Sequence, residues 1–156
     1  MRVWGVSRSG KGDTNLAEKI IPATELAEAL PHADFVVVSA PETQETRRLI
    51  GAREIALMKP TGRVINVARG SLVDQAALIA ALQSGKLAGA ALDVTDPEPP
   101  AADDVLWKAP NLLLTPHTSA ISDRLWTRQS ALLLDLLERW FDGREMFNQV
   151  DLRRGY

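Results

Sequence analysis

Residues 112–120 read Leu112-Leu113-Leu114-Thr115-Pro116-His117-Thr118-Ser119-Ala120. The leucines and the threonine predict a short buried strand, and Pro116 ends it, because a proline restricts the residue before it to extended backbone. We therefore expect His117 at the carboxyl end of a strand. In open α/β sheets, ligands bind at that end.

Two upstream stretches have the same design. Residues 63–70, Arg-Val-Ile-Asn-Val-Ala-Arg-Gly, form an apolar run that carries Arg69 into a turn. Residues 89–94, Gly-Ala-Ala-Leu-Asp-Val, run into a proline-rich loop that carries Glu98. Because parallel strands end at the same edge of a sheet, we expect Arg69, Glu98 and His117 to converge there.

Each of these side chains also has an ordinary structural explanation. A single histidine at a strand end is often a hydrogen-bonded structural residue, and Arg69 alone is explained as a solvated loop charge. Their order and shared context together favour a chemical site.

The motifs around these residues carry a family resemblance. Asn66-Val67-Ala68-Arg69-Gly70, Ala91-Leu92-Asp93-Val94 with Glu98-Pro99, and Thr115-Pro116-His117 resemble the three signatures of D-2-hydroxyacid dehydrogenases. The ending, Gln149-Val150-Asp151 to Arg154-Gly155-Tyr156, is similar to the glyoxylate/hydroxypyruvate reductase branch. The resemblance covers essentially all of this chain, but only the C-terminal half of a typical member.

The order of elements supports the fold that this resemblance implies. Apolar runs alternate with helical patterns, which predicts a doubly wound α/β domain with parallel strands. We expect strands at 2–6, 19–21, 35–39, 63–67, 89–94 and 112–115, and helices at 25–30, 51–59, 74–84 and 122–141. Residues 1–156 would then form one truncated, Rossmann-like NAD(P)-binding domain.

The resemblance implies an oxidoreductase that reduces small 2-keto acids to D-2-hydroxy acids. Arg69 is expected to clamp the substrate carboxylate and polarise the ketone through charge-assisted hydrogen bonds. His117 is expected to give a proton near neutral pH, and the negative charge of Glu98 would favour the imidazolium. The hydride comes from the nicotinamide cofactor.

The first predicted strand ends in Ser7-Arg8-Ser9, where the resemblance places the adenine ribose of the cofactor. A guanidinium and hydroxyls suit the 2′-phosphate of NADP, although NAD is an alternative cofactor and a solvated basic turn is an alternative role. Gly5 to Gly12 also spells part of a phosphate-binding loop, but Gly12 replaces the required Ser or Thr. Further cofactor contacts that the resemblance implies are Pro41, Val67, Ala68, Arg69, Asp93, His117 and Ala120.

Composition excludes several other classes of function. The net charge of -2 with scattered basic residues gives no basic face for nucleic acid. The absence of cysteine and the presence of only two histidines argue against disulfides and a Cys/His metal site. No apolar run of about 18 residues is present, so no membrane partner is expected. No signal peptide precedes the first strand, and we expect a cytoplasmic setting.

Some expected family features are missing from the sequence. Nothing matches G-x-G-x-x-G, and the first Rossmann strand and the substrate domain are not found. In the usual strand order the first strand is central, so strands 2–6 and 35–39 would either re-pair or leave an edge exposed. We therefore expect negligible activity from this chain alone and some tendency to form homo-oligomers. The alternative is a non-catalytic relic or a partner-dependent α/β module.

Two expectations concern packing. The helix at 122–141 is apolar around much of its circumference, so we expect it to be largely covered. The four tryptophans, at positions 4, 107, 126 and 140, are expected in the core or at domain contacts.

Overall fold

The computed structural model describes residues 1–153, so Arg154-Gly155-Tyr156, part of the ending considered above, lie outside the described residues. A four-stranded sheet in the order β3-β4-β5-β6 forms the centre of the structure, and all its neighbouring strands are parallel. The strands are β3 (Phe35–Val38), β4 (Arg63–Asn66), β5 (Gly89–Leu92) and β6 (Leu112–Leu114). The parallel sheet with intervening helices confirms the predicted Rossmann-like α/β class.

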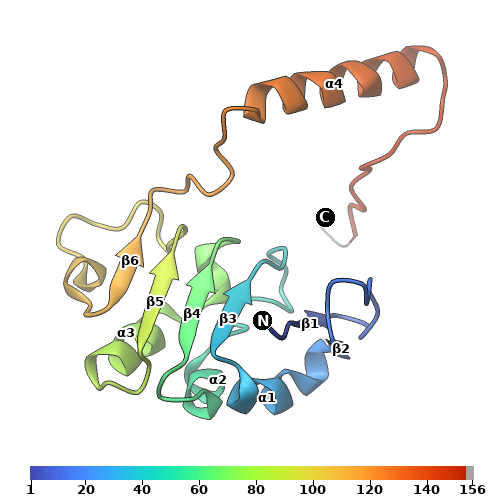
Figure 1. Cartoon of the computed structure of the whole chain (residues 1–156). Helices are drawn as coiled ribbons and strands as arrows, with labels where there is room; N and C mark the ends of the chain where they lie inside the picture. The colour runs from blue at the N-terminus through green and yellow to red at the C-terminus, as the bar shows by residue number, and fades with distance from the viewer. Residues whose placement is uncertain (154–156) are drawn as a thin grey trace.

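A second, two-stranded sheet lies beside β3 (Figure 1). It pairs β1 (Trp4–Ser7) with β2 (Lys19–Pro22), again in parallel. Among residues 1–153, β1 pairs only with β2, and β3 pairs only with β4. Strands 2–6 and 35–39 were expected either to re-pair or to leave an edge exposed, and within residues 1–153 β1 and β3 do not pair with each other and each has one edge without a partner strand.

The helices between the strands are short. They are α1 (Leu26–Ala29), α2 (Ala52–Leu57) and α3 (Gln75–Gln83), with 3₁₀ turns η1 (Ala23–Glu25), η2 (Leu30–His32), η3 (Gly70–Leu72) and η4 (Val105–Lys108). Asp74 begins α3 as predicted, because its side chain accepts a hydrogen bond from the backbone N–H of Ala77 at 3.1 Å. Gly85, at φ +71°, ends the helix in the left-handed conformation that favours glycine.

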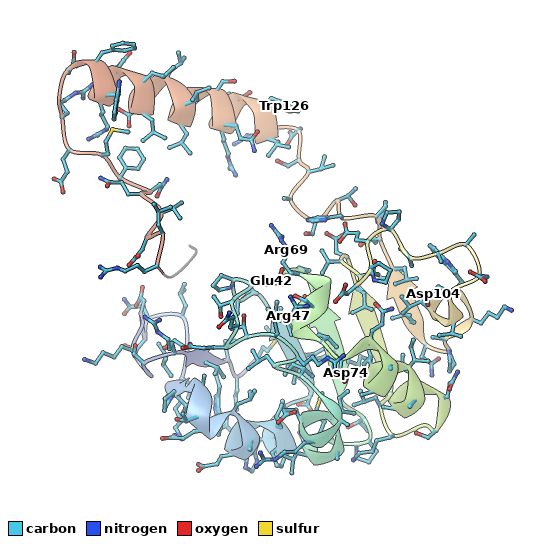
Figure 2. The ribbon with its side chains drawn as sticks, turned by 180° about the vertical axis from the view of Figure 1, so that it is seen from behind. Glu42, Arg47, Arg69, Asp74, Asp104 and Trp126 are labelled. Carbon is cyan, nitrogen blue, oxygen red and sulfur yellow. The ribbon has the colours of Figure 1, made fainter. Side chains whose placement is uncertain are left out.

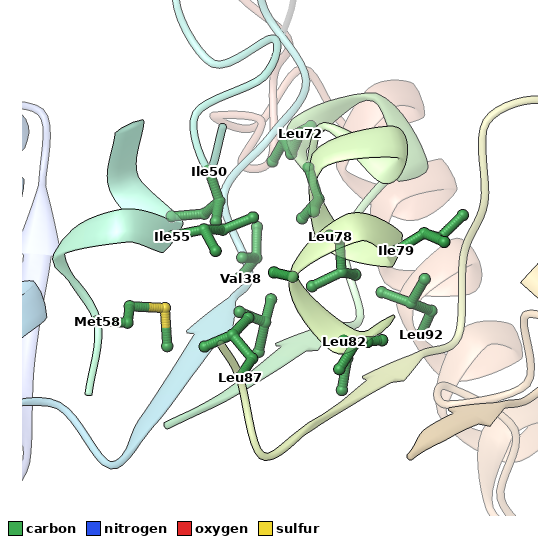
Figure 3. Packing of buried hydrophobic residues seen from close by; sticks show 14 of the residues in the cluster. Val38, Ile50, Ile55, Met58, Leu72, Leu78, Ile79, Leu82, Leu87 and Leu92 are labelled. Atoms are coloured by element: carbon green, nitrogen blue, oxygen red, sulfur yellow. The ribbon is translucent and has the colours of Figure 1, made fainter. Parts of the chain in front are cut away.

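The hydrophobic core lies between α2, α3 and one face of the four-stranded sheet (Figure 3). Strand residues alternate between faces, so each strand of the sheet gives this core every second side chain. The fully buried side chains include Leu30, Ile50, Met58, Val64, Leu72, Leu78, Leu87 and Leu106.

The last helix, α4 (Leu125–Phe141), contradicts the expectation that it is covered. It lies apart from the sheet (Figure 1), and none of its residues is buried. Its apolar stripe therefore meets no complementary surface among residues 1–153. Trp107, Trp126 and Trp140 are 54%, 76% and 70% exposed, so the core is excluded for these three tryptophans and their role at domain contacts stays a prediction.

Candidate active site

The turn after β4 is built by Asn66, whose side chain is fully buried. Its Oδ1 accepts a hydrogen bond from the N–H of Ala68 at 3.0 Å, and its Nδ2 donates to the carbonyl of Arg69 at 2.8 Å. The amide thereby satisfies backbone groups on both sides of the turn. Arg69 is exposed, and its Nη1 donates to the carbonyl of Ala68 at 2.6 Å. Figure 2 shows Arg69 at the upper edge of the sheet.

Gly70 brings this turn against the loop that follows β5. A Cβ at position 70 would stand 2.1 Å from the carbonyl carbon and oxygen of Thr95 and 2.6 Å from the nitrogen of Asp96. Only a glycine allows two backbone segments to approach so closely. The Arg69 turn and the loop that carries Glu98 therefore hold each other in place.

Asp93 organises the loop that follows β6. Its buried carboxylate accepts hydrogen bonds from the hydroxyl of Thr115 and from the N–H groups of Thr118 and Ser119, the latter two at 2.9 Å each. These bonds, that from Thr115 foremost, hold the pKa of Asp93 well below its usual range. The carboxylate is thus a fixed negative charge under this loop.

His117 is placed by backbone contacts. Its N–H donates to the carbonyl of Asp93 at 2.8 Å, and its φ of +53° is in the left-handed region. The imidazole Nδ1 lies 2.6 Å from Oε1 of Glu98. Because Glu98 engages Nδ1, Nε2 is the ring nitrogen that can meet a substrate.

The predicted catalytic residues therefore come together only in part. Glu98 and His117 form a pair, whereas Arg69 makes no hydrogen bond or ion pair with either of them in the described part of the chain. A cavity of about 270 Å³ lined by Arg47, Ser71, Asp74 and other residues contains none of these three. The side chains of His117 and Glu98 are 44% and 38% exposed and Arg69 is exposed, so the candidate site is an open edge of the sheet.

The predicted cofactor residues lie at the ends of β1, β3, β4 and β5 and in the loop after β6. Ser7 ends β1 and donates from Oγ to the carbonyl of Lys11 at 2.8 Å. Arg8 and Ser9 follow it and are exposed, and the Arg8 guanidinium has no partner among residues 1–153. This group lies on the two-stranded sheet, apart from the Glu98–His117 pair in the fold.

The other predicted contacts follow the strands of the larger sheet. The carbonyl of Pro41 accepts a hydrogen bond from the Thr46 hydroxyl at 2.7 Å, and Val67 donates its N–H to the carbonyl of Val38. Ala68 is buried and Ala120 is exposed. The structure thus leaves their role in cofactor binding as a prediction.

No helix in residues 1–153 is long and apolar enough to cross a bilayer. No group of three or more His, Cys, Asp or Glu side chains within the same residues has the geometry of a metal site.

Comparison with known proteins decides the family. Residues 1–119 match the family described as D-isomer specific 2-hydroxyacid dehydrogenase, NAD binding domain. The chain belongs to this family. The three motifs that suggested this dehydrogenase domain all lie inside the matched range, and the match confirms the resemblance.

The relatives of this dehydrogenase domain include glyoxylate reductases. That of Thermococcus gammatolerans is 44% identical over 119 residues, which are 75% of this chain and 34% of the relative. A crystal structure of a D-isomer specific 2-hydroxyacid dehydrogenase from Xanthobacter autotrophicus, in complex with NADPH and MES, is 39% identical with a TM-score of 0.86. The match covers 99% of this chain and 62% of the Xanthobacter chain.

A third relative is the NADPH-dependent glyoxylate/hydroxypyruvate reductase of Sinorhizobium meliloti, solved with NADP and sulfate. It is 30% identical with a TM-score of 0.88, and 99% of this chain covers 49% of it. This dehydrogenase domain spans between about a third and two fifths of the length of the first curated relatives that it matches.

The sequence patterns predicted no structural role for three residues that hold the loops of the site in place. Asn66, Gly70 and Thr115 touch backbone or a carboxylate and no catalytic atom. A polar residue that ends an apolar run was the available signal for Asn66 and Thr115. The contact of Gly70 depends on a loop 25 positions later, which no local pattern reveals.

Proposed function

We propose that this chain carries the catalytic edge of a dehydrogenase that reduces small 2-keto acids of the glyoxylate or hydroxypyruvate type to D-2-hydroxy acids. The observation that carries the proposal is the contact of 2.6 Å between His117 Nδ1 and Glu98 Oε1. A histidine oriented by a carboxylate, with its second ring nitrogen available, is the usual arrangement of a general acid. The family and its glyoxylate reductase members support the substrate class.

Substrate binding, proton donation and positioning are each assigned to a different residue of this chain. Arg69 binds the substrate carboxylate through two N–H groups and polarises the ketone, once its guanidinium leaves the carbonyl of Ala68. His117 donates a proton from Nε2 to the oxygen of the ketone, and Glu98 retains the imidazolium in place through Nδ1. Asp93 holds the loop on which His117 sits.

The residues at the end of β1 fit a phosphorylated dinucleotide. Arg8 offers a guanidinium without a partner in the described residues, and Ser7 and Ser9 offer hydroxyls. These groups suit the 2′-phosphate of NADP, which supplies the hydride to the ketone carbon when bound as NADPH. We therefore favour NADP over NAD for this chain.

We infer that the 156-residue chain alone turns over negligibly. Holding reactants in register contributes about 7–11 kcal/mol to catalysis. The candidate site is an open edge, so water reaches Arg69 and weakens its electrostatic effect. A purified, monodisperse chain that oxidises NADPH with glyoxylate at an ordinary enzymatic rate, and loses this rate in His117→Ala, would contradict the inference.

The cofactor preference is tested by fluorescence titration with NADPH and NADH. The sample is a chimera in which this chain replaces the matching part of the Xanthobacter dehydrogenase. Losing charge-assisted hydrogen bonds in Arg8→Ala should weaken NADPH binding by about 10- to 100-fold and leave NADH nearly unchanged. Arg53→Ala, another exposed arginine, is the control. Equal affinities that Arg8→Ala does not alter would refute the preference.

The role of His117 is tested in the same chimera. His117→Ala should lower kcat by about 10²–10⁴-fold while NADPH still binds, because the proton donor acts mainly in the transition state. His32→Ala, which removes the other histidine of the chain, should retain kcat. Near-normal turnover of the His117→Ala chimera would exclude His117 as the proton donor.

A further inference from the structure

One hydrogen bond joins helix α3 to the loop that carries Glu98. The backbone N–H of Asp96, two residues before Glu98, donates to Oε1 of Gln75 at 3.2 Å. Gln75 is the first residue of α3 and is half-buried. Within residues 1–153, no other backbone N–H of residues 95–98 donates a hydrogen bond. The bond to Gln75 is therefore the anchor of this stretch of backbone to the helix.

Helix α3 is a rigid support for this bond. Its residues Leu78, Ile79 and Leu82 are buried in the hydrophobic core. The Asp74 side chain caps its first turn through the N–H of Ala77. Because Gln75 lies in that first turn, its backbone is held by the core and by the cap together. The Asp96 N–H then fixes the direction of the Gln75 side chain.

The loop transmits this restraint to Glu98. The hydroxyl of Thr95 donates to the carbonyl of Pro97 at 2.9 Å, which ties the two residues on either side of Asp96. The accepting carbonyl belongs to the peptide bond between Pro97 and Glu98. Prolines at positions 97 and 99 have a fixed φ on both sides of Glu98. Few free torsions therefore lie between the Asp96 N–H and the Glu98 carboxylate.

The position of Glu98 decides how the ring of His117 is oriented. Glu98 Oε1 lies 2.6 Å from His117 Nδ1, whereas the backbone of His117 is held separately, by the carbonyl of Asp93. Within the described part of the chain, no other hydrogen bond joins residues 95–100 to residues 115–121. The contact between the two side chains therefore depends on where each loop is anchored.

We propose that Gln75 is a positioning residue: by holding Asp96, it holds the Glu98 carboxylate against Nδ1 of His117. This inference rests on the proposed function, in which His117 donates its proton from Nε2. Gln75 forms no hydrogen bond with Glu98 or His117 among residues 1–153, so it acts through the loop. The carboxylate keeps a proton on Nδ1, and this leaves Nε2 as the nitrogen that exchanges its proton with a substrate.

The tautomer of His117 is the readout, because a merely structural role of Gln75 would not change it. Proton–nitrogen NMR spectra of the full chain at a pH of about 9, where histidine is neutral, show which ring nitrogen carries the proton. Gln75→Leu should move the His117 signals toward those of Glu98→Ala, in which the carboxylate is missing. The Asp96 amide should exchange hydrogen about 5- to 10-fold faster. The signals of His32 are the internal reference.

Two further variants separate the hydrogen bond from the loss of a polar side chain. Gln83→Leu makes the same chemical change at an exposed position of α3 and should leave the His117 signals unchanged. Gln75→Glu retains an acceptor oxygen for the Asp96 N–H and should retain the wild-type signals. Gln75 borders the cavity of about 270 Å³ described above, so leucine fits there without a clash. Circular dichroism verifies that each variant folds.

Two results would overturn the proposal. Faster exchange at Asp96 with unchanged His117 signals would show that Gln75 supports the loop alone, and unchanged exchange at Asp96 would show that the bond does not hold it. In the chimera, Gln75→Leu should lower kcat by about 10-fold and leave NADPH binding unchanged. A His117→Ala chimera with normal kcat, together with an altered tautomer in Gln75→Leu, would refute the proposed function and support the positioning role. The two failures are thus distinguishable.

Discussion

The closest backbone approach in the site makes Gly70→Ala the most informative stability test. The new Cβ would be more than 1 Å too close to the carbonyl carbon and oxygen of Thr95, compared with an ordinary contact of 3.4 Å. The opposing atoms belong to the main chain, so no rotamer change relieves the contact. Overpacking costs about 1–3 kcal/mol when side chains can adjust, so here we expect at least about 3 kcal/mol.

Urea unfolding followed by circular dichroism measures this loss. Gly5→Ala is the matched control, because its new Cβ would stand 3.4 Å from Cγ1 of Ile20, an ordinary contact with a side chain. We expect the control to unfold within about 1 kcal/mol of the wild type. In NMR spectra, the amide signals near Arg69 and Glu98 should both shift in Gly70→Ala. A Gly70→Ala protein within about 1 kcal/mol of the wild type would refute the argument.

Three further changes test the groups that support the site. Asn66→Ala leaves the N–H of Ala68 and the carbonyl of Arg69 without partners and should cost about 2–4 kcal/mol in urea unfolding. Because the pKa of Asp93 is lowered in the folded chain, its stabilisation is present above the unfolded pKa of about 3.9 and is lost as the pH falls through the folded value. The free energy of unfolding should therefore fall below pH of about 4 more steeply in the wild type than in Asp93→Asn, and equal slopes in acid titrations would contradict this. Leu78→Ala empties a fully buried core position and should cost about 2–5 kcal/mol in the same urea assay.

The strands of the larger sheet were predictable because each is an apolar run between turn residues. The runs at 35–39, 63–67, 89–94 and 112–115 contain β3 to β6, and the order of the chain gave their parallel arrangement. The ends of α3 were also predictable, because Asp74 and Gly85 act on the backbone next to them in the sequence. Local sequence signals therefore sufficed to predict the strands of the larger sheet and the ends of α3.

The coverage of α4 could not be predicted. Its apolar residues indicate a buried helix, but burial depends on a second surface, and the described residues provide none. In the site, the pairing of Glu98 with His117 followed from the shared strand edge. The direction of the Arg69 side chain could not be predicted, because it depends on a local hydrogen bond to the carbonyl of Ala68.

The position of His117 is set by atoms that every amino acid shares. Its backbone N–H is bound to the carbonyl of Asp93, and the next two N–H groups are bound to the Asp93 carboxylate. The loop therefore holds position 117 through its backbone, and the φ of +53° at this position favours unbranched side chains over β-branched ones. A series of side chains without a branched Cβ at position 117 therefore exchanges the reactive group while the backbone that carries it keeps its hydrogen bonds.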